Sequence, residues 1–210
     1  MNEGVVALRD GARIRVRQGS SSDRGLLLHG FDRLSDESRY RRFLAPMPEL
    51  TETVVHYLTD VDHHDHESIV AVDDETGEGI GVARYVRLGE RPDVADLAVT
   101  VVDDWQGRGV GTLLLEVLGA RAREEGITSF TALMLATNTE MLDVLEHLGP
   151  LQIVDRDSGT IEIEAPIPEV GLSPALRKLL WVAARSDGAV PLAGRRPWML
   201  ERQAGREDNA

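Results

Sequence analysis

A glycine-rich segment between an apolar strand and an amphipathic helix carries the most specific chemical signal in the sequence. Gly107, Gly109 and Gly111 stand at alternate positions around the start of a helix predicted over residues 110–125. Because glycine has no Cβ, the backbone N–H groups of such a turn can converge on one point. The helix start adds unpaired N–H groups and the positive end of its dipole. The segment therefore predicts an anion site that holds a pyrophosphate through the backbone.

Two other phosphate-binding motifs fit this segment poorly. A Walker loop requires Gly-Lys-Ser/Thr, and the segment contains no lysine. A dinucleotide fingerprint requires Gly-x-Gly-x-x-Gly within a βαβ unit, whereas the spacing here is Gly-x-Gly-x-Gly after predicted antiparallel strands. The remaining alternative is a turn that only joins strand to helix.

A second polar cluster, Asp62–Glu67, reads Asp-His-His-Asp-His-Glu. Imidazole and carboxylate groups are good metal ligands, but adjacent residues of a short loop rarely point at one ion, and no second cluster completes a site. We therefore expect a solvated acidic loop and no metal. Its alternative role is an acidic rim that attracts a cationic amine to an acceptor site.

Composition excludes several functional classes. Among 210 residues, 36 are acidic and 23 are Lys or Arg, and the net charge of −13 argues against nucleic-acid binding. The absence of cysteine excludes disulfides, thiolate nucleophiles and Cys-based zinc sites. The sequence has neither a membrane-spanning stretch nor a signal-peptide pattern. We expect a cytoplasmic protein with no membrane partner and a weak preference for cationic partners.

Hydrophobic periodicity predicts an α/β (α+β) fold, in which a mixed sheet positions the glycine-rich segment. The expected strands cover residues 12–17, 68–72, 80–88, 94–102, 130–136, 152–154 and 160–164. The expected helices are one around residues 26–31, a short one beginning near residue 35, and those over residues 51–59, 110–125 and 140–148. Residues 1–168 are expected to form one domain. Residues 169–210 are expected to form a C-terminal helical extension and tail.

The predicted extension has an amphipathic helix pattern between Leu172 and Ala183, with leucines on one face. This apolar face is too organised for a free tail. We expect it to pack on the sheet or across a homodimer.

The segment Gln106–Gly111 reads Gln-Gly-Arg-Gly-Val-Gly. It matches the (Gln/Arg)-x-x-Gly-x-(Gly/Ala) pyrophosphate signature of a known family, and the sequence therefore resembles the GNAT family of N-acetyltransferases. Downstream, Asn138 opens a predicted helix that ends at Gly149, which looks like the second block of the family. The resemblance covers roughly residues 12–165. It implies the GNAT fold, a mixed and mostly antiparallel sheet of six to seven strands flanked by helices.

The resemblance also implies transfer of an acetyl group from acetyl-CoA to a primary amine by direct attack on the thioester. The backbone of Val99 and Val101 is expected to bond the pantetheine arm, and Asn138 to contact the cofactor or the surroundings of the amine. Parallel strands around positions 99 and 133 are expected to splay and admit the thioester, with N–H groups that polarise its carbonyl. The expected pyrophosphate-binding residues are Gln106, Gly107, Arg108, Gly109, Val110, Gly111 and Thr112.

A closer likeness is to the catalytic domain of bacterial protein lysine acetyltransferases. It rests on Leu34–Phe43 (Leu-Ser-x-Glu-Ser-x-Tyr-x-Arg-Phe), Leu58–Asp62 (Leu-Thr-x-Val-Asp) and Gly81–Tyr85 (Gly-Val-Ala-Arg-Tyr). It implies a protein lysine as the first candidate acceptor and a small amine as the second. Some of those relatives carry a cyclic-nucleotide domain, for which this chain has no room, so we expect no cyclic-nucleotide control.

Two departures from the family pattern concern proton transfer. A lysine-like ammonium with a pKa of ~10.4 is only about one part in 10³ neutral at pH 7, so the amine needs a base or a desolvating site. In the lysine acetyltransferase relatives a glutamate before the glycine turn is that base, and Asp96 stands at the matching position. We predict Asp96 as the general base, directly or through one water. Alternatively, Asp96 is a solvent-facing residue of the strand and does not act as a base.

The second departure concerns the general acid. Many family members use a tyrosine in the helix after the asparagine to protonate the leaving thiolate, and the aligned residue here is Leu145. The two departures leave a second function open, a non-catalytic acyl-CoA-binding module with a degenerate active site.

Overall fold

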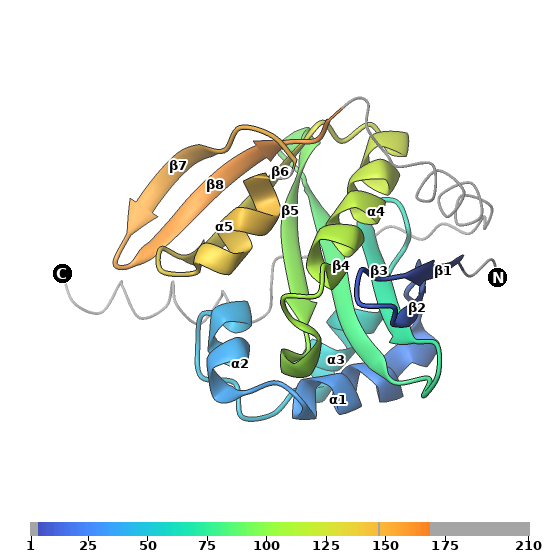
Figure 1. Cartoon of the computed structure of the whole chain (residues 1–210). Coiled ribbons are helices and arrows are strands. Elements are labelled where there is room, and N and C mark those ends of the chain that lie inside the picture. Colours follow the sequence, from blue (N-terminus) through green and yellow to red (C-terminus); the bar gives the residue numbers. More distant parts are fainter. Residues whose placement is uncertain (1–3, 147, 169–210) are drawn as a thin grey trace.

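The computed structural model describes residues 4–146 and 148–168 of the chain. The predicted C-terminal extension over residues 169–210, and the packing or homodimer contact predicted for its helix, lie outside the described residues. The described part is a single sheet with helices on both faces (Figure 1).

Eight strands form the sheet, in the order β1-β2-β3-β4-β5-β6-β8-β7. All neighbouring strands are antiparallel except β5 and β6. This confirms the mixed, mostly antiparallel sheet, but with eight strands instead of the predicted six to seven. The strands are β1 (Gly4–Ala7), β2 (Arg13–Gln18), β3 (His66–Asp73), β4 (Gly79–Leu88), β5 (Arg91–Val101), β6 (Ser129–Leu135), β7 (Gln152–Asp157) and β8 (Thr160–Pro166).

The strand that was not predicted is β1, which pairs with β2 at one edge of the sheet. The turn between them contains Asp10 and Gly11, and Gly11 has a φ of 89°, in the left-handed region that glycine supplies at turns. The N–H of Leu8 donates to the carbonyl of Ala12 at 2.8 Å and closes the turn. Four residues give too short an alternation to identify a strand, so the Asp-Gly pair was the available signal.

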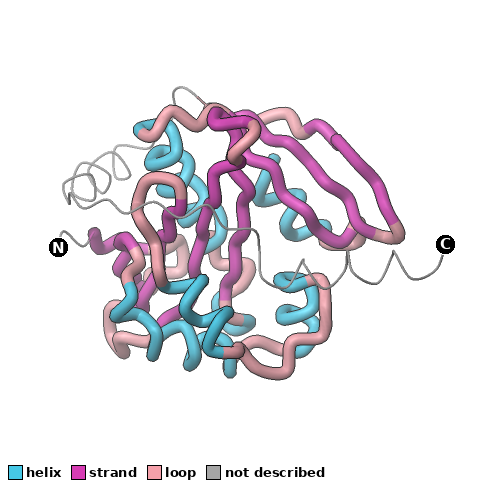
Figure 2. Tube along the Cα trace, turned by 180° about the vertical axis from the view of Figure 1, so that it is seen from behind, coloured by secondary structure: helices cyan, strands magenta, loops and turns pink. Residues whose placement is uncertain are grey.

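Five α-helices accompany the strands within the described residues, and they lie on both faces of the sheet (Figures 1 and 2). Helix α4 contacts β3, β4 and β5, while α1 contacts β4 and α3 from the other side. None of the described helices has the length and apolar character needed to cross a membrane. The helices are α1 (Arg24–Asp32), α2 (Asp36–Phe43), α3 (Glu52–Thr59), α4 (Val110–Glu124) and α5 (Thr139–Glu146).

Local capping chemistry explains why these helices begin and end where they do. The hydroxyl of Ser35 accepts from the N–H of Ser38 at 3.2 Å, which caps the start of α2. Thr51 caps α3 in the same way. Just after the end of α4, Gly126 has a φ of 79°, the left-handed conformation in which glycine commonly ends a helix.

Close packing fixes α4, and with it the glycine-rich turn, against the sheet. Leu114 and Leu118 of α4 are completely buried. A Cβ at Gly81 would lie 3.0 Å from Leu114 Cδ1 and 3.1 Å from the carbonyl oxygen of Thr100. Glycine at this position of β4 therefore allows α4 to approach the strand closely, and the start of α4 is held at the end of β5.

Candidate functional site

Strands β5 and β6 pair over a short stretch and then separate from each other. Their parallel pairing covers three residue pairs and ends at Asp96 and Thr131. β5 continues to Val101 and β6 to Leu135, each still paired with its outer neighbour. The facing edges beyond Asp96 and Thr131 are therefore not joined to each other, which confirms the predicted splaying of the two strands.

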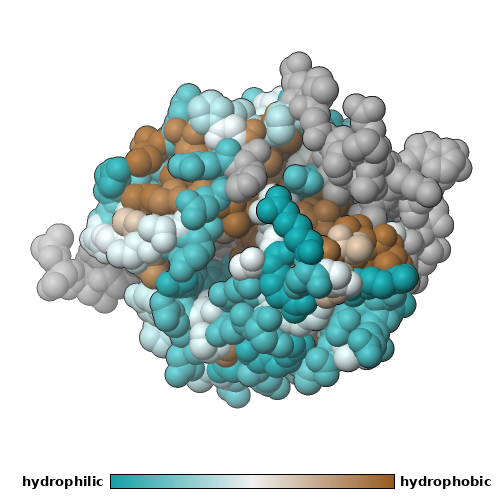
Figure 3. Space-filling view, in the orientation of Figure 1, coloured by the Kyte–Doolittle hydropathy of each residue, from teal (hydrophilic) through white to brown (hydrophobic). Residues whose placement is uncertain are grey.

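The separated strands open into a groove of about 910 Å³. Residues of β5, β6, the glycine-rich turn, α4, α5, α2 and the β1–β2 turn line it. On the face shown in Figure 3, hydrophilic residues cover α1 and α2, while apolar residues gather over α5 and β7. The volume of the groove lies near the upper end of the range for ligand sites, about 300–1,000 Å³. The groove therefore has room for a long, extended ligand.

The glycine-rich turn adopts a conformation that selects glycine. Gly107 and Gly109 have φ values of 70° and 86°, and Gly109 is the N-cap residue, directly before the first residue of α4. A Cβ at either position would meet nothing within 4 Å, so backbone conformation and not space imposes glycine here. The first N–H groups of α4 have no partner within the helix. The turn thus has the form expected of an anion site.

Most of the residues predicted to hold the cofactor lie along the groove. The predicted cofactor-binding residues that line the groove are Val99, Val101, Gln106, Gly107, Arg108, Gly109, Gly111, Thr112 and Asn138. Val110 differs because its side chain is 1% exposed in the core, which leaves only its backbone for a ligand. Gln106 donates to the carbonyl of Val101 at 3.0 Å and ties the turn to β5. Asn138 accepts from the N–H of Met141 at 3.2 Å and caps α5.

Arg108 is held by two contacts from outside the turn. Its Nε donates to Asp10 Oδ2 at 2.6 Å, and its guanidinium carbon lies 3.9 Å from the centre of the Trp105 ring. The hydrogen bond from Arg108 lowers the pKa of Asp10. Because Asp10 and Arg108 both line the groove, a basic and an acidic side chain stand together beside the glycine-rich turn.

Two parts of the groove wall were not predicted from the sequence. Residues 6–10, from β1 and the turn after it, line one part, and α2 contributes Arg41 and Arg42. Arg41 Nη1 lies 3.1 Å from Glu140 Oε2 and joins α2 to α5. This pair spans 99 positions of the chain, so no local motif could reveal it.

Asp96 stands where β5 and β6 begin to separate, and it is half-buried. Side chains alternate between the two faces of a strand, so Asp96 shares a face with Ala98 and Thr100. Thr100 lies beneath the helices α1 and α3. Asp96 is not among the residues that line the groove. Leu145, at the position of the missing general acid, is completely buried in the core.

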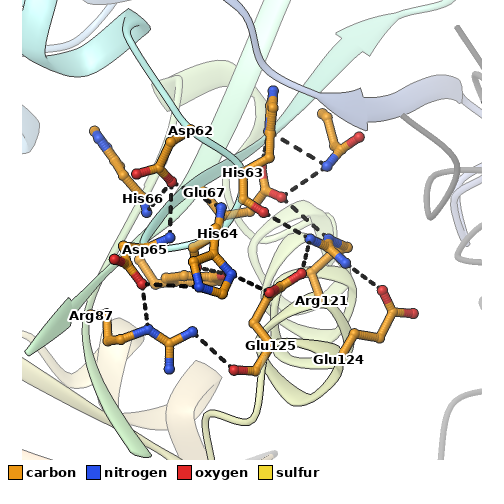
Figure 4. A network of polar contacts seen from close by, with 12 residues as sticks. Asp62, His63, His64, Asp65, His66, Glu67, Arg87, Arg121, Glu124 and Glu125 are labelled. Carbon is orange, nitrogen blue, oxygen red and sulfur yellow. Dashed lines mark hydrogen bonds and ion pairs between the residues drawn. The ribbon is translucent and has the colours of Figure 1, made fainter. Parts of the chain in front are cut away.

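The Asp62–Glu67 segment is an ordered network (Figure 4). Glu67 is 0% exposed, and its carboxylate lies 3.2 Å from Arg121 Nε and 2.8 Å from His63 Nδ1. The hydrogen bond with Glu67 raises the pKa of His63. The prediction of a solvated loop is therefore wrong for Glu67, because its carboxylate bonds α4 within the protein interior.

The same segment is tied to the end of α4 and to β4 (Figure 4). His64 Nδ1 lies 2.5 Å from Glu125 Oε2, and Arg87 Nε donates to Asp65 Oδ1 at 2.6 Å. Residues 60–67 do not line the groove, so the alternative role as an acidic rim of that groove gains no support. Within the described part of the chain, no group of three His, Asp or Glu side chains is placed to hold a metal ion.

His66 lies on the opposite face of the sheet from Glu67 and is 8% exposed. Its ring centre is 5.2 Å from that of Tyr57, and its Nε2 is 3.2 Å from Arg84 Nη1, which can only donate. Burial, with a smaller effect of the Arg84 cation, lowers the pKa of His66 to about 3. The imidazole is therefore neutral in the folded protein at neutral pH and accepts a hydrogen bond from Arg84.

This burial predicts a specific loss of stability in acid. Below pH 6.5, the usual pKa of histidine, the unfolded chain binds one more proton at His66 than the folded chain does. The free energy of unfolding then falls by up to about 1.4 kcal/mol for each pH unit between 6.5 and 3 from this group. We expect His66→Gln to be less stable at pH 7 and to have a shallower pH dependence, measured by urea unfolding at pH 7, 6 and 5. His56→Gln is the control, since the side chain of His56 is 77% exposed. Equal slopes in wild type and His66→Gln would contradict the assignment.

Comparisons with known sequences agree with this site. Residues 31–149 match the Acetyltransferase (GNAT) family. Acetyltransferase Pat of Mycolicibacterium smegmatis is 33% identical over 169 residues, which cover 80% of this chain and 50% of Pat. An acetyltransferase of Pseudomonas aeruginosa is 31% identical over 158 residues, 74% of this chain and 84% of the relative. The chain thus spans about half the length of Pat.

Solved structures show the same fold. The GNAT domain of S. lividans PAT has a TM-score of 0.73 and 37% identity, covering 79% of this chain and 97% of that domain. A cAMP-binding acyltransferase from Mycobacterium smegmatis has a TM-score of 0.58 and 28% identity, covering 87% of this chain and 56% of that protein. Sequence, fold and the glycine-rich turn agree, and the chain belongs to the acetyltransferase (GNAT) family.

Proposed function

We propose that the protein is an N-acetyltransferase that moves an acetyl group from acetyl-CoA to a primary amine. The observation that carries this proposal is the separation of β5 and β6 into a groove that reaches the glycine-rich turn. Facing strand edges that are not joined to each other offer a row of N–H and C=O groups, which suits the amides of a pantetheine arm. The turn and the start of α4 suit the pyrophosphate.

The residues of the groove fit this cosubstrate. Val99 and Val101 would bond the pantetheine arm through their backbone, and residues 106–112 would surround the pyrophosphate, with Asn138 beside the arm. A Cβ at Gly111 would lie 3.8 Å from side-chain atoms of both Val101 and Val144, on the groove side of α4. A larger side chain at this position would therefore project between β5 and α5, where the arm would lie.

The proposed reaction is a direct attack on the thioester. The amine nitrogen forms a bond to the carbonyl carbon while the C–S bond breaks, and CoA leaves as a thiolate that takes its proton from solvent. One proton of the ammonium passes to the carboxylate of Asp96, directly or through one water, before the attack. The second proton leaves the nitrogen to solvent as the amide forms. A thiol with a pKa of ~8.5 is a fair leaving group, so the reaction proceeds without a side-chain acid at Leu145.

The proposed acceptor is a protein lysine, with a small amine as the second candidate. Support comes from the resemblance of residues 34–43, 58–62 and 81–85 to bacterial protein lysine acetyltransferases. The net charge of −13 also favours approach of a cationic acceptor over long range.

A non-catalytic acyl-CoA-binding module is the second candidate function. Two observations favour it, because Asp96 does not line the groove and Leu145 is buried at the position of the usual acid. In this case the groove would bind acyl-CoA, and no acyl group would be transferred.

Thiol release separates the two functions with low background, because the protein contains no cysteine. The assay mixes the protein with acetyl-CoA and a panel of polylysine, lysine-rich protein and spermidine, and follows free CoA with a thiol reagent. Calorimetric titration with acetyl-CoA measures binding in parallel. Turnover on any amine supports the enzyme. Binding without turnover on every amine supports the module, and neither binding nor turnover refutes both.

The Asp10–Arg108 pair gives a prediction about affinity. The carboxylate of Asp10 stands beside the turn proposed to hold the pyrophosphate, so it repels the cosubstrate, while Trp105 also holds Arg108. We expect Asp10→Asn to bind CoA a few-fold more tightly, because removal of the carboxylate removes this repulsion. The expected size of the effect is that of one exposed charge interaction. The gain should shrink in high salt. Calorimetry at low and high salt measures both effects, and weaker binding would show instead that Asp10 positions Arg108.

A further inference from the structure

Helices cover both faces of the sheet (Figure 2). A mostly apolar cavity of about 100 Å³ lies on the face that α1 and α3 cover. Residues of β3, β4 and β5 form its floor, and residues of α1, α2 and α3 form its roof. Leu27, Phe31, Leu58 and Val82 are among its apolar lining residues. The cavity lies between the helices and the sheet and is distinct from the groove between β5 and β6.

The cavity adjoins the groove at the free part of β5. Thr100 and Arg42 line both spaces, so these two side chains form a shared wall. Thr100 lies beyond Asp96, in the segment of β5 that does not pair with β6. Arg84, which is opposite Ala98 in the β4–β5 register, also lines the cavity. The cavity therefore lies directly behind residues 98–100 of β5.

We infer that this cavity is an acyl-chain subsite, which receives the aliphatic chain of acyl-CoA substrates longer than acetyl. The inference rests on the proposed function, in which the thioester lies along the edge of β5 near Asp96. A chain on the thioester carbonyl can then pass Thr100 into the cavity. Its volume is about two thirds of that of a ~150 Å³ apolar cavity that binds benzene. Butyryl is therefore the chain that fits, and octanoyl is too long.

The chemistry of the lining favours the acyl chain over the acceptor. A lysine-like acceptor arrives as an ammonium ion, and burial of a charge in a mostly apolar cavity is unfavourable. The charged residues of the lining do not offset this cost, because Arg42 and Arg84 are cations and the carboxylate of Asp23 is paired with Arg17. An aliphatic chain carries no polar group, and each methylene that it buries favours binding by about fourfold. Two additional methylenes predict that butyryl-CoA binds up to about 16-fold more tightly than acetyl-CoA.

Two substitutions make the cavity smaller without an evident clash. A Cβ at Gly30 would lie 3.8 Å from the carbonyl oxygen of Gly79 and 4.0 Å from Val102 Cγ1, which are ordinary contacts. Val82 pairs with Thr100 across β4 and β5, so Val82→Ile adds a methyl group beside the shared wall. Leu27→Ala changes the cavity in the opposite direction. Gly25→Ala is the matched control on α1, since a Cβ there meets nothing within 4 Å and Gly25 does not line the cavity.

The test is calorimetric binding of acetyl-, butyryl-, hexanoyl- and octanoyl-CoA, which needs no acceptor. We expect wild type and Gly25→Ala to prefer butyryl-CoA over acetyl-CoA by at least about five-fold, and Gly30→Ala/Val82→Ile to reduce this preference to about two-fold or less. Leu27→Ala should move the preference toward hexanoyl-CoA. Equal binding of acetyl- and butyryl-CoA to wild type, or a preference that the double variant leaves unchanged, overturns the inference. If the double variant does not fold, the acyl-chain preference of Leu27→Ala tests the inference in its place, and a preference equal to that of wild type overturns it.

Thiol release distinguishes this inference from the proposed function. Turnover of acetyl-CoA without a butyryl preference refutes the subsite alone. A butyryl preference in binding without turnover on any amine refutes the transferase and keeps the subsite. A changed KM for the amine in the double variant, with an unchanged chain preference, would assign the cavity to the acceptor and overturn the inference.

Discussion

Gly109→Val is expected to weaken binding of acetyl-CoA by at least about 100-fold. Valine is strained at the φ of 86° that Gly109 adopts, and relief of that strain turns the N–H groups at the start of α4 away from the groove. A hydrogen bond to a charged group contributes about 1.5–3 kcal/mol, so loss of two such bonds is sufficient for this effect. Calorimetric titration of the folded variant measures the loss.

Gly126→Val is the matched control for this experiment. Gly126 lies just after the other end of α4, with a φ of 79° and open space around its Cβ position, so valine meets the same strain there. Both variants should lose about 1–2 kcal/mol of folding stability, and only Gly109→Val should lose binding. Comparable affinity in both variants would show that the glycine-rich turn is only a connection between β5 and α4.

Asp96→Asn is expected to lower kcat by about 10²–10³-fold near pH 7 and to leave the affinity for acetyl-CoA unchanged. Asparagine keeps the shape of the side chain but cannot accept the proton of the ammonium, and general base catalysis typically contributes about 10²–10⁴-fold. At a pH near the ~10.4 pKa of a lysine amine, much of the amine is already neutral. The difference between wild type and variant should therefore shrink as the pH rises toward 10.

Two further variants show whether Asp96 acts on the amine or only supports the strand. Asp93→Asn makes the same chemical change at an exposed position of β5 outside the groove, and it should retain the wild-type rate. Asp96→Glu restores a carboxylate and should recover activity, since the resemblance to protein lysine acetyltransferases implies a glutamate at this position. A loss in Asp96→Asn that is constant from pH 7 to 10 would remove Asp96 from proton transfer.

Local rules were sufficient for the elements that carry the glycine-rich turn. The apolar strand β5, the helical period of α4 and the glycine at its end depend on neighbours within a few residues. The placement of Val99, Val101 and Asn138 along one groove followed from the family resemblance. The binding and catalytic roles of these residues remain predictions.

Other features depend on contacts between distant parts of the chain. Glu67 meets Arg121 across 54 positions, and Asp10 meets Arg108 across 98. From sequence alone, the charge cluster Asp62–Glu67 is predicted to be solvent-exposed, because Arg121, the buried partner of Glu67, lies on a helix far along the chain. The wall formed by residues 6–10 was missed for a different reason, because a four-residue strand is too short to show its period. The cavity behind Thr100 arises only when three helices pack on one face of the sheet.

Three residue pairs are all that link the β1–β5 part of the sheet to the β6–β8 part through strand pairing. Proteins open locally along their weakest boundaries, so the segment from β6 to β8 is expected to exchange its amide hydrogens as one cooperative unit, before β3 and β4. A ligand bound to both free edges stabilises the closed form in proportion to its concentration and affinity. The acyl-CoA would then be a structural part of the sheet, replacing the missing ladder between its two halves and leaving with each product.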